Sequence, residues 1–370
     1  VYAASAEKGL KDEFADYFRV GNILNGSTVA NSAITANILK DYNSIECENE
    51  MKPDATLVQS QCNGTNVGVS LNNAAAIIDF CVNNNIAMRG HAFVWHSQTP
   101  SWFFKENYNA NGAWVSSSVM DQRLESYIKN MFNAIETQYP SLNLYAYDVV
   151  NEAVSDDSNR TANYGGAREA GDNNVTSGTS AWVSVYGDNS FVEKAFTYAR
   201  KYAEKGMKLI YNDYNVYVPA KEQNIYNLVK GLKEKNLIDG IGLQPTVDLY
   251  NPDELKGDSY DSFENCLKKY AELNVDIQIT ELSFKIDEET GERDEKSLKR
   301  QADRYQEMFE LLKKMDTASG GPCNITSVTV FGICDDYPLY DDLVQCLYLW
   351  DKNAKPKESF YRVREVGESK

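Results

Sequence analysis

The feature that most constrains the fold is a regular alternation of short β-rich runs with longer helical patterns. Eight strand candidates occur, at residues 18–24, 44–49, 86–94, 145–151, 208–212, 240–244, 276–281 and 327–333. Six of the intervening segments place apolar residues at helical spacing, at residues 71–85, 120–139, 189–205, 220–236, 260–274 and 298–315. Strands that alternate with helices in this way are typical of the α/β class, and eight repeats favour a (β/α)8 barrel.

Two other organisations are compatible with the sequence. A length of 370 residues suggests two domains, although one barrel of ~250 residues with long insertions is equally allowed. A doubly wound open sheet is the second alternative, but no GxGxxG or Walker loop follows any early strand. We therefore predict a single catalytic barrel domain over residues 1–370, with long loops after strands 4 and 7 at residues 156–190 and 284–295.

Composition excludes several classes of protein. The hydrophobic content of 42% is enough for a large core, and the net charge of −17 disfavours nucleic acid as a partner. No apolar run approaches ~18 residues, so we expect no membrane span. The seven cysteines contain no CxxC pair, which disfavours a zinc module or a thioredoxin-like site.

The two histidines, His91 and His96, are candidate metal ligands, but hydrogen bonding is the better interpretation of both. They lie five apart in a strand, so their side chains should point to opposite faces, and a third ligand is missing. We expect neither a metal nor another cofactor.

Two glutamates end strongly apolar strands. The stretch "YAYDVVNEAVSDD" carries Glu152 directly after strand 4, and "VDIQITELSF" carries Glu281 at the end of strand 7. A single glutamate at a strand end is usually an exposed loop residue or a helix cap. Two of them on different sides of one barrel mouth can face each other, and a facing pair of carboxyl groups is what glycoside hydrolysis requires.

Aromatic side chains accompany the carboxylates near the predicted mouth. Trp95, Trp102, Tyr211 and Tyr214 are individually compatible with ordinary core or rim positions. As a group they indicate surfaces on which the apolar faces of sugar rings pack.

The chain resembles the glycoside hydrolase family 10 endo-β-1,4-xylanases. The stretches that carry the resemblance are "FRVGNILN", "ENEMKPD", "RGHAFVWHSQTPSWF", "YDVVNEAVSDD", "SFVEKAFTYAR", "LIYNDYN", "LIDGIGLQ" and "VDIQITELSF". They follow the order of the family and cover nearly the whole predicted barrel.

The resemblance implies a retaining mechanism, with Glu152 as the general acid/base and Glu281 as the nucleophile. Asn151 matches the residue that holds the 2-hydroxyl of the sugar in subsite −1, Gln244 a polar neighbour of the nucleophile, and Tyr214 a cleft aromatic. The positions that match sugar contacts on the glycone side are Glu48, Asn49, Lys52, His91, Trp95 and Gln98.

The sequence departs from the family pattern at subsite −1. Strand 6 continues as Gln244-Pro245-Thr246, so Thr246 stands where the family usually has a histidine. After strand 8, Phe331 and Leu339 stand where the family usually has tryptophans. We expect a wider, altered subsite −1, unless the loop aligns differently and Tyr337 or Tyr340 replaces the lost aromatic.

The resemblance thus predicts an endo-acting retaining xylanase whose partner is xylan or a related β-1,4-linked polysaccharide. The alternatives are a β-1,4-glucanase or glycosidase on the same scaffold, or a catalytically silent carbohydrate-binding barrel. We expect a secreted monomer, and the start at Val1 without a Met suggests a mature or trimmed chain.

Overall fold

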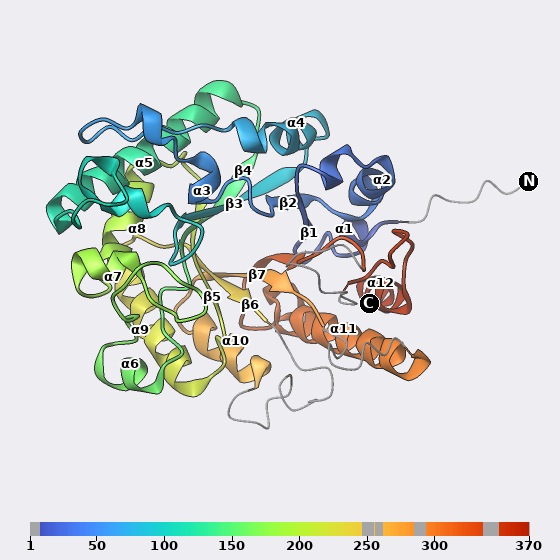
Figure 1. Ribbon diagram of the computed structural model, residues 1–370. Helices are drawn as coiled ribbons and strands as arrows, with labels where there is room; N and C mark the ends of the chain where they lie inside the picture. Colours follow the sequence, from blue (N-terminus) through green and yellow to red (C-terminus); the bar gives the residue numbers. More distant parts are fainter. Residues whose placement is uncertain (1–7, 246–254, 256–261, 285–293, 336–347, 370) are drawn as a thin grey trace, which may run out of the picture.

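The computed structural model describes residues 8–245, 255, 262–284, 294–335 and 348–369. Eight parallel strands close into a barrel in sequence order, each paired with its neighbours and β8 paired with β1 (Figure 1). The strands are β1 Arg19–Leu24, β2 Ser44–Cys47, β3 Ala87–Val94, β4 Leu144–Asn151, β5 Lys208–Tyr214, β6 Gly240–Gln244, β7 Asp276–Leu282 and β8 Ile325–Val330. The predicted (β/α)8 barrel is confirmed, and every predicted strand is present within a few residues.

Helices surround the barrel, as Figure 1 shows. They are α1 Leu10–Glu13, α2 Ser32–Asp41, α3 Pro53–Thr56, α4 Ala75–Asn83, α5 Ser117–Gln138, α6 Ser158–Asn163, α7 Ala181–Tyr186, α8 Ser190–Tyr202, α9 Pro219–Glu234, α10 Phe263–Ala271, α11 Glu295–Met315 and α12 Glu358–Glu368. No described helix has both the length and the apolar character needed to cross a bilayer.

The long segment after β4 is only partly the loop that the sequence predicts. It contains the short helices α6 and α7, and their N-caps Asp157 and Ser180 accept hydrogen bonds from backbone N–H groups in the first turn. Most of the predicted loop after β7 lies outside the described residues.

Helix α5 illustrates how the sequence forms the outer layer. The Ser116 side chain caps its N-terminus by accepting from the Val119 N–H. The apolar residues on one face of the helix are buried, and they include Tyr127 and Phe132. Both contact Phe93 of β3 edge-on, so α5 covers the strand pair that leads to Glu152.

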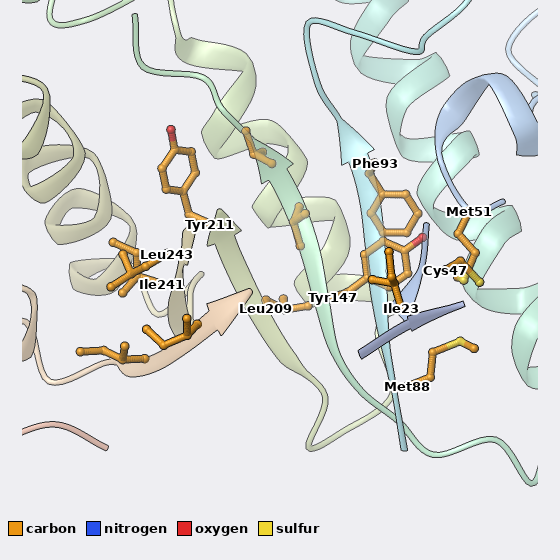
Figure 2. Close-up of a cluster of buried hydrophobic side chains, with 14 of the residues drawn as sticks. Ile23, Cys47, Met51, Met88, Phe93, Tyr147, Leu209, Tyr211, Ile241 and Leu243 are labelled. Carbon is orange, nitrogen blue, oxygen red and sulfur yellow. The ribbon is translucent and has the colours of Figure 1, made fainter. Parts of the chain in front are cut away.

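One glycine permits the close packing of β3 against β4. The rings of Phe93 and Tyr147 stack with centroids 4.0 Å apart, and Figure 2 shows the two side chains face to face. A Cβ at Gly90 would lie 2.2 Å from the Tyr147 ring, so only glycine leaves room for this ring beside β3.

The side chains on the opposite side of these strands fill the barrel with polar groups. The guanidinium of Arg89 is fully buried and donates to Glu46 Oε1 at 2.5 Å, to Gln278 Oε1 at 2.7 Å and to Asp148. Arg89 therefore connects β2, β3, β4 and β7 beneath the mouth. The usual branched apolar filling of such a barrel is replaced here by an ionic network.

Candidate active site

The ends of β4 and β7 bring Glu152 and Glu281 together, and Gln244 at the end of β6 lies between them. The Gln244 amide is assigned from its surroundings the orientation in which its oxygen accepts from Asn212 Nδ2 at 2.7 Å and its nitrogen faces the carboxylates. Its nitrogen then lies 2.8 Å from Glu281 Oε2 and 3.3 Å from Glu152 Oε2. The two carboxylate oxygens are thus at most about 6 Å apart, the sum of these distances, which is near the ~5–5.5 Å of a retaining pair.

Several contacts fix the Glu152 carboxyl. Trp95 Nε1 donates to Glu152 Oε1 at 3.1 Å, and Asn151 Nδ2 lies 3.2 Å from Oε2. The Glu152 backbone adopts φ +55°, in the left-handed region that side-chain-bearing residues rarely occupy. Residues held in this way cluster at functional sites, because the surrounding contacts must offset the conformational cost.

The pKa values of both glutamates are raised. Burial is the main cause for Glu152, and the nearby negative charge of Asp213 adds to it. Burial also raises the pKa of Glu281, to about 8, against the opposing charges of His91 and Lys52, while Glu152 raises it further. Since two adjacent carboxylates resist simultaneous ionisation, the pair retains a proton close to neutral pH.

The predicted glycone-side residues form a connected group. Lys52 Nζ donates to Asn49 Oδ1 at 2.8 Å and to Gln98 Oε1 at 3.0 Å, and it lies 5.1 Å from the centre of the Trp95 ring. Glu48 accepts from Asn25 Nδ2 at 2.8 Å. The structure therefore brings together the ends of β2 and β3 as the sequence predicts.

His91 belongs to the ionic network below the carboxylates. Its Nδ1 lies 2.8 Å from Asp148 Oδ2, and this hydrogen bond raises the pKa of His91 although burial opposes the charge. His96 is also buried, but burial lowers its pKa to about 3, and its Nδ1 has no hydrogen-bond partner among the described residues. The surroundings of the two imidazoles therefore shift their pKa values in opposite directions.

The same network contains a group of side chains with the chemistry to bind a metal ion. Glu46, His91 and Asp148 present ligand atoms within 4.8 Å of one another. Arg89 bonds both carboxylates and offsets part of their negative charge, so a cation would have to displace a buried guanidinium. Among the described residues this group is an ion network rather than a metal centre.

Tyr214, the predicted cleft aromatic, lies at the end of β5 and is half-buried. Its hydroxyl donates to Asp156, and Lys221 Nζ lies 3.6 Å from the centre of its ring. Tyr214 is therefore held on both its hydroxyl and its ring face.

The altered positions of subsite −1 are only partly described. Phe331 follows β8, is half-buried and donates its N–H to the Leu282 carbonyl at 3.1 Å. Thr246 and Leu339 lie outside the described residues, as do Tyr337 and Tyr340. The predicted widening of this subsite stays a prediction.

Sequence reasoning missed the residues that support the carboxylates. Glu46, Arg89 and Asp148 interrupt apolar strands at inward-facing positions, and that interruption is a signal the sequence does carry. Asn212 and Arg168 also contact the Asn151–Glu152 segment, yet no local pattern marks either of them.

Comparison with known proteins decides the family. The model of glycosyl hydrolase family 10 matches residues 9–366. The chain belongs to glycosyl hydrolase family 10. Endo-1,4-beta-xylanase Y of Acetivibrio thermocellus is 53% identical over 367 residues, which cover 99% of this chain and 33% of that protein. A putative endo-1,4-beta-xylanase of Caldicellulosiruptor saccharolyticus is 51% identical over 78% of this chain and 87% of that protein.

Solved structures of family 10 members agree. The CBM22-1–GH10 modules of Clostridium thermocellum Xyn10B, complexed with xylohexaose, superpose with a TM-score of 0.89 at 50% identity. The match covers 99% of this chain and 68% of that one. This family 10 chain spans only a third of the length of the Acetivibrio relative.

Proposed function

We propose that this chain is a retaining endo-β-1,4-xylanase that hydrolyses internal β-1,4 linkages of xylan. The observation that carries the proposal is the approach of Glu152 and Glu281 on either side of the Gln244 amide nitrogen. A separation of at most about 6 Å leaves no space for the water that an inverting pair must accommodate, at ~6.5–9.5 Å. The named activities of the family 10 relatives support xylan as the substrate.

In the first step, a Glu281 carboxylate oxygen attacks the anomeric carbon while Glu152 protonates the departing glycosidic oxygen. The bond between that carbon and oxygen breaks, and a covalent glycosyl–enzyme forms. In the second step, Glu152 removes a proton from water, whose oxygen attacks the anomeric carbon and releases Glu281. One carboxyl must begin protonated and the other ionised.

The surroundings support this division of roles. The Gln244 N–H at 2.8 Å, together with the positive charges of Lys52 and His91, favours the ionised form of Glu281. Asp213 faces Glu152 with a negative charge and favours the protonated form there. The shared proton therefore belongs on Glu152 in the reactive state.

The glycone-side roles extend the proposal. Asn49, Lys52 and Gln98 present a connected set of donors and acceptors at the ends of β2 and β3, which is suited to sugar hydroxyls. The glucanase and silent-binder alternatives gain no support from the described site. Secretion and a monomeric state stay predictions.

Replacement of the nucleophile tests the proposal. We expect wild-type protein to release reducing sugar from xylan, and Glu281→Ala to lose at least about 10⁴-fold in kcat, because no covalent intermediate can form. The assay is reducing-sugar release from linear xylan at the pH optimum. A Glu281→Ala rate comparable to wild type would refute the assignment, and an inactive wild type would refute the function.

The acid/base role of Glu152 has a separate signature. We expect Glu152→Ala to lose about 10²–10⁴-fold in kcat/KM on xylan, but much less on an activated aryl xylobioside. The good leaving group of the aryl substrate needs little protonation. Equal losses on the two substrates would count against Glu152 as the acid.

A further inference from the structure

Arg168 reaches from the segment after β4 to the backbone of Glu152. Its side chain is almost completely buried, at 3% exposure. Arg168 Nε donates to the Glu152 carbonyl at 2.7 Å, and Nη2 lies 3.4 Å from the Val154 carbonyl and 3.5 Å from the Tyr214 hydroxyl. The third nitrogen, Nη1, donates to the Gly178 carbonyl at 3.3 Å. One guanidinium thus joins Glu152 to the far part of the same segment.

The backbone of Glu152 needs such an anchor. Its φ of +55° is an unfavourable conformation for a glutamate, and it persists only where neighbouring groups hold it. The Glu152 N–H donates to the Asn212 carbonyl at 2.8 Å, which ties one side of the residue to β5. Arg168 donates to the Glu152 carbonyl, on the other side of the residue. The N–H of the next residue, Ala153, donates to the Tyr211 hydroxyl at 3.1 Å. Arg168 is the only one of these three anchors that does not come from β5.

We propose that Arg168 is a positioning residue of the reaction, which anchors the Glu152 main chain so that the carboxyl faces the leaving oxygen at proton-donation distance. The inference rests on the proposed acid/base role of Glu152. Arg168 contacts the main chain of Glu152 and not its carboxyl, so its effect on proton transfer is exerted through the position and the pKa of Glu152. A displacement of about 1 Å at a catalytic group can cost about 100-fold in rate.

The charge of Arg168 gives the proposal a second consequence. The charged and titratable groups around Glu152 come from several elements, namely His96 after β3, Asp213 of β5, Lys221 of α9, Glu281 of β7 and Arg168 itself. Burial and Asp213 raise the pKa of Glu152, whereas Arg168 and Lys221 lower it. Removal of the Arg168 charge therefore raises this pKa further, and protonated Glu152 persists to higher pH.

Arg160 offers a matched control in the same segment. Its Nε donates to the Ala167 carbonyl at 2.7 Å and its Nη2 to the Arg168 carbonyl at 3.1 Å. Arg160 therefore supports the fold of the segment, but it makes no contact with Glu152 in the described structure. A purely structural role for these arginines would make the two positions behave alike.

The test compares Arg168→Gln, Arg168→Lys and Arg160→Gln on xylan and on an activated aryl xylobioside, as kcat/KM across pH. For Arg168→Gln we expect a loss of roughly 10- to 100-fold on xylan, a smaller loss on the aryl substrate, and a basic limb of the pH profile that moves to higher pH. Arg168→Lys keeps the charge but not the forked geometry. It should therefore lose less kcat/KM than Arg168→Gln, again more on xylan than on the aryl substrate, and the basic limb of its pH profile should stay where it is in wild type. Arg160→Gln should show neither effect.

Two results would overturn the inference. One is a loss in either Arg168 variant that is equal on both substrates, and the other is a basic limb in Arg168→Gln that stays where it is in wild type. If Arg168→Gln does not fold, the difference between the losses of Arg168→Lys on xylan and on the aryl substrate decides alone. Failure of the proposed function looks different, since wild type would then be inactive on xylan or Glu152→Ala would show no leaving-group dependence.

Discussion

At the scale of single residues, the buried position of Glu281 suits the proposed reaction but lowers the stability of the fold. Burial and the neighbouring Glu152 raise its pKa to about 8, well above the ordinary value of 4.5. The unfolded chain releases its glutamate protons near pH 4.5, whereas the folded Glu152–Glu281 pair keeps one shared proton to higher pH. The folded state binds more protons in this window, so the contribution of Glu281 to stability falls as pH rises from about 4.5 to 8.

Glu281→Gln should therefore stabilise the protein while it abolishes activity. We expect its melting temperature to exceed that of wild type by a few degrees, with a difference that grows from pH 5 to pH 8. Thermal unfolding followed by circular dichroism at several pH values measures this. Glu136→Gln, an exposed position on α5, is the control and should show no such trend. A gap that is constant across pH would contradict the raised pKa of Glu281.

At the scale of elements, a buried lysine of α9 connects the end of β5 to the segment that follows Glu152. Lys221 Nζ lies 3.1 Å from Asp213 Oδ1 of β5 and 3.0 Å from Asp156 Oδ1, which follows β4. Asp213 is completely buried and also accepts from the Tyr211 hydroxyl at 2.5 Å. Lys221 thus connects the end of β5 to the segment that follows β4.

Lys221→Met should loosen this connection. We expect a loss of roughly 3 kcal/mol in the free energy of unfolding, because removal of one partner leaves the Asp213 carboxylate buried without its cation. Denaturant unfolding gives the value. Lys235→Met is the control, since Lys235 pairs with Glu193 on the surface and exposed pairs contribute little. Equal destabilisation by the two variants would show that burial of the pair does not matter here.

Two helices, α2 and α12, could not be predicted from local sequence patterns. Helix α2 was missed although Asn31 caps it, because its short sequence SAITANILKD mixes β-branched and polar residues and has weak apolar periodicity. Helix α12 was missed for a similar reason, as it contains aromatic and β-branched residues and Gly367. Both helices are stabilised by packing, α12 on α11 and α2 on α1, rather than by propensity.

At the scale of the whole molecule, closure of the barrel brings the ends of β4, β6 and β7 to one mouth. The ion network around Arg89 connects four strands below that mouth, and His91 interacts electrostatically with Glu281. Because these charges are buried and mutually paired, the network holds the positions of the strands as well as the electrostatic environment of the carboxylates. The residues of the Arg89 network therefore contribute both to the fold and to the candidate site.

The sequence by itself determined the eight strands, six of the helices and the barrel, because apolar periodicity is a local feature. The resemblance to family 10 then singled out the two strand-end glutamates. Only the tertiary structure decided that Gln244 lies between those glutamates, that Arg89 pairs with both Glu46 and Asp148, and that Arg168 bonds the Glu152 carbonyl. These contacts join residues far apart in the chain, and their geometry depends on how the strands register around the closed barrel. No local pattern encodes that register, since it follows from the packing of all eight strands together.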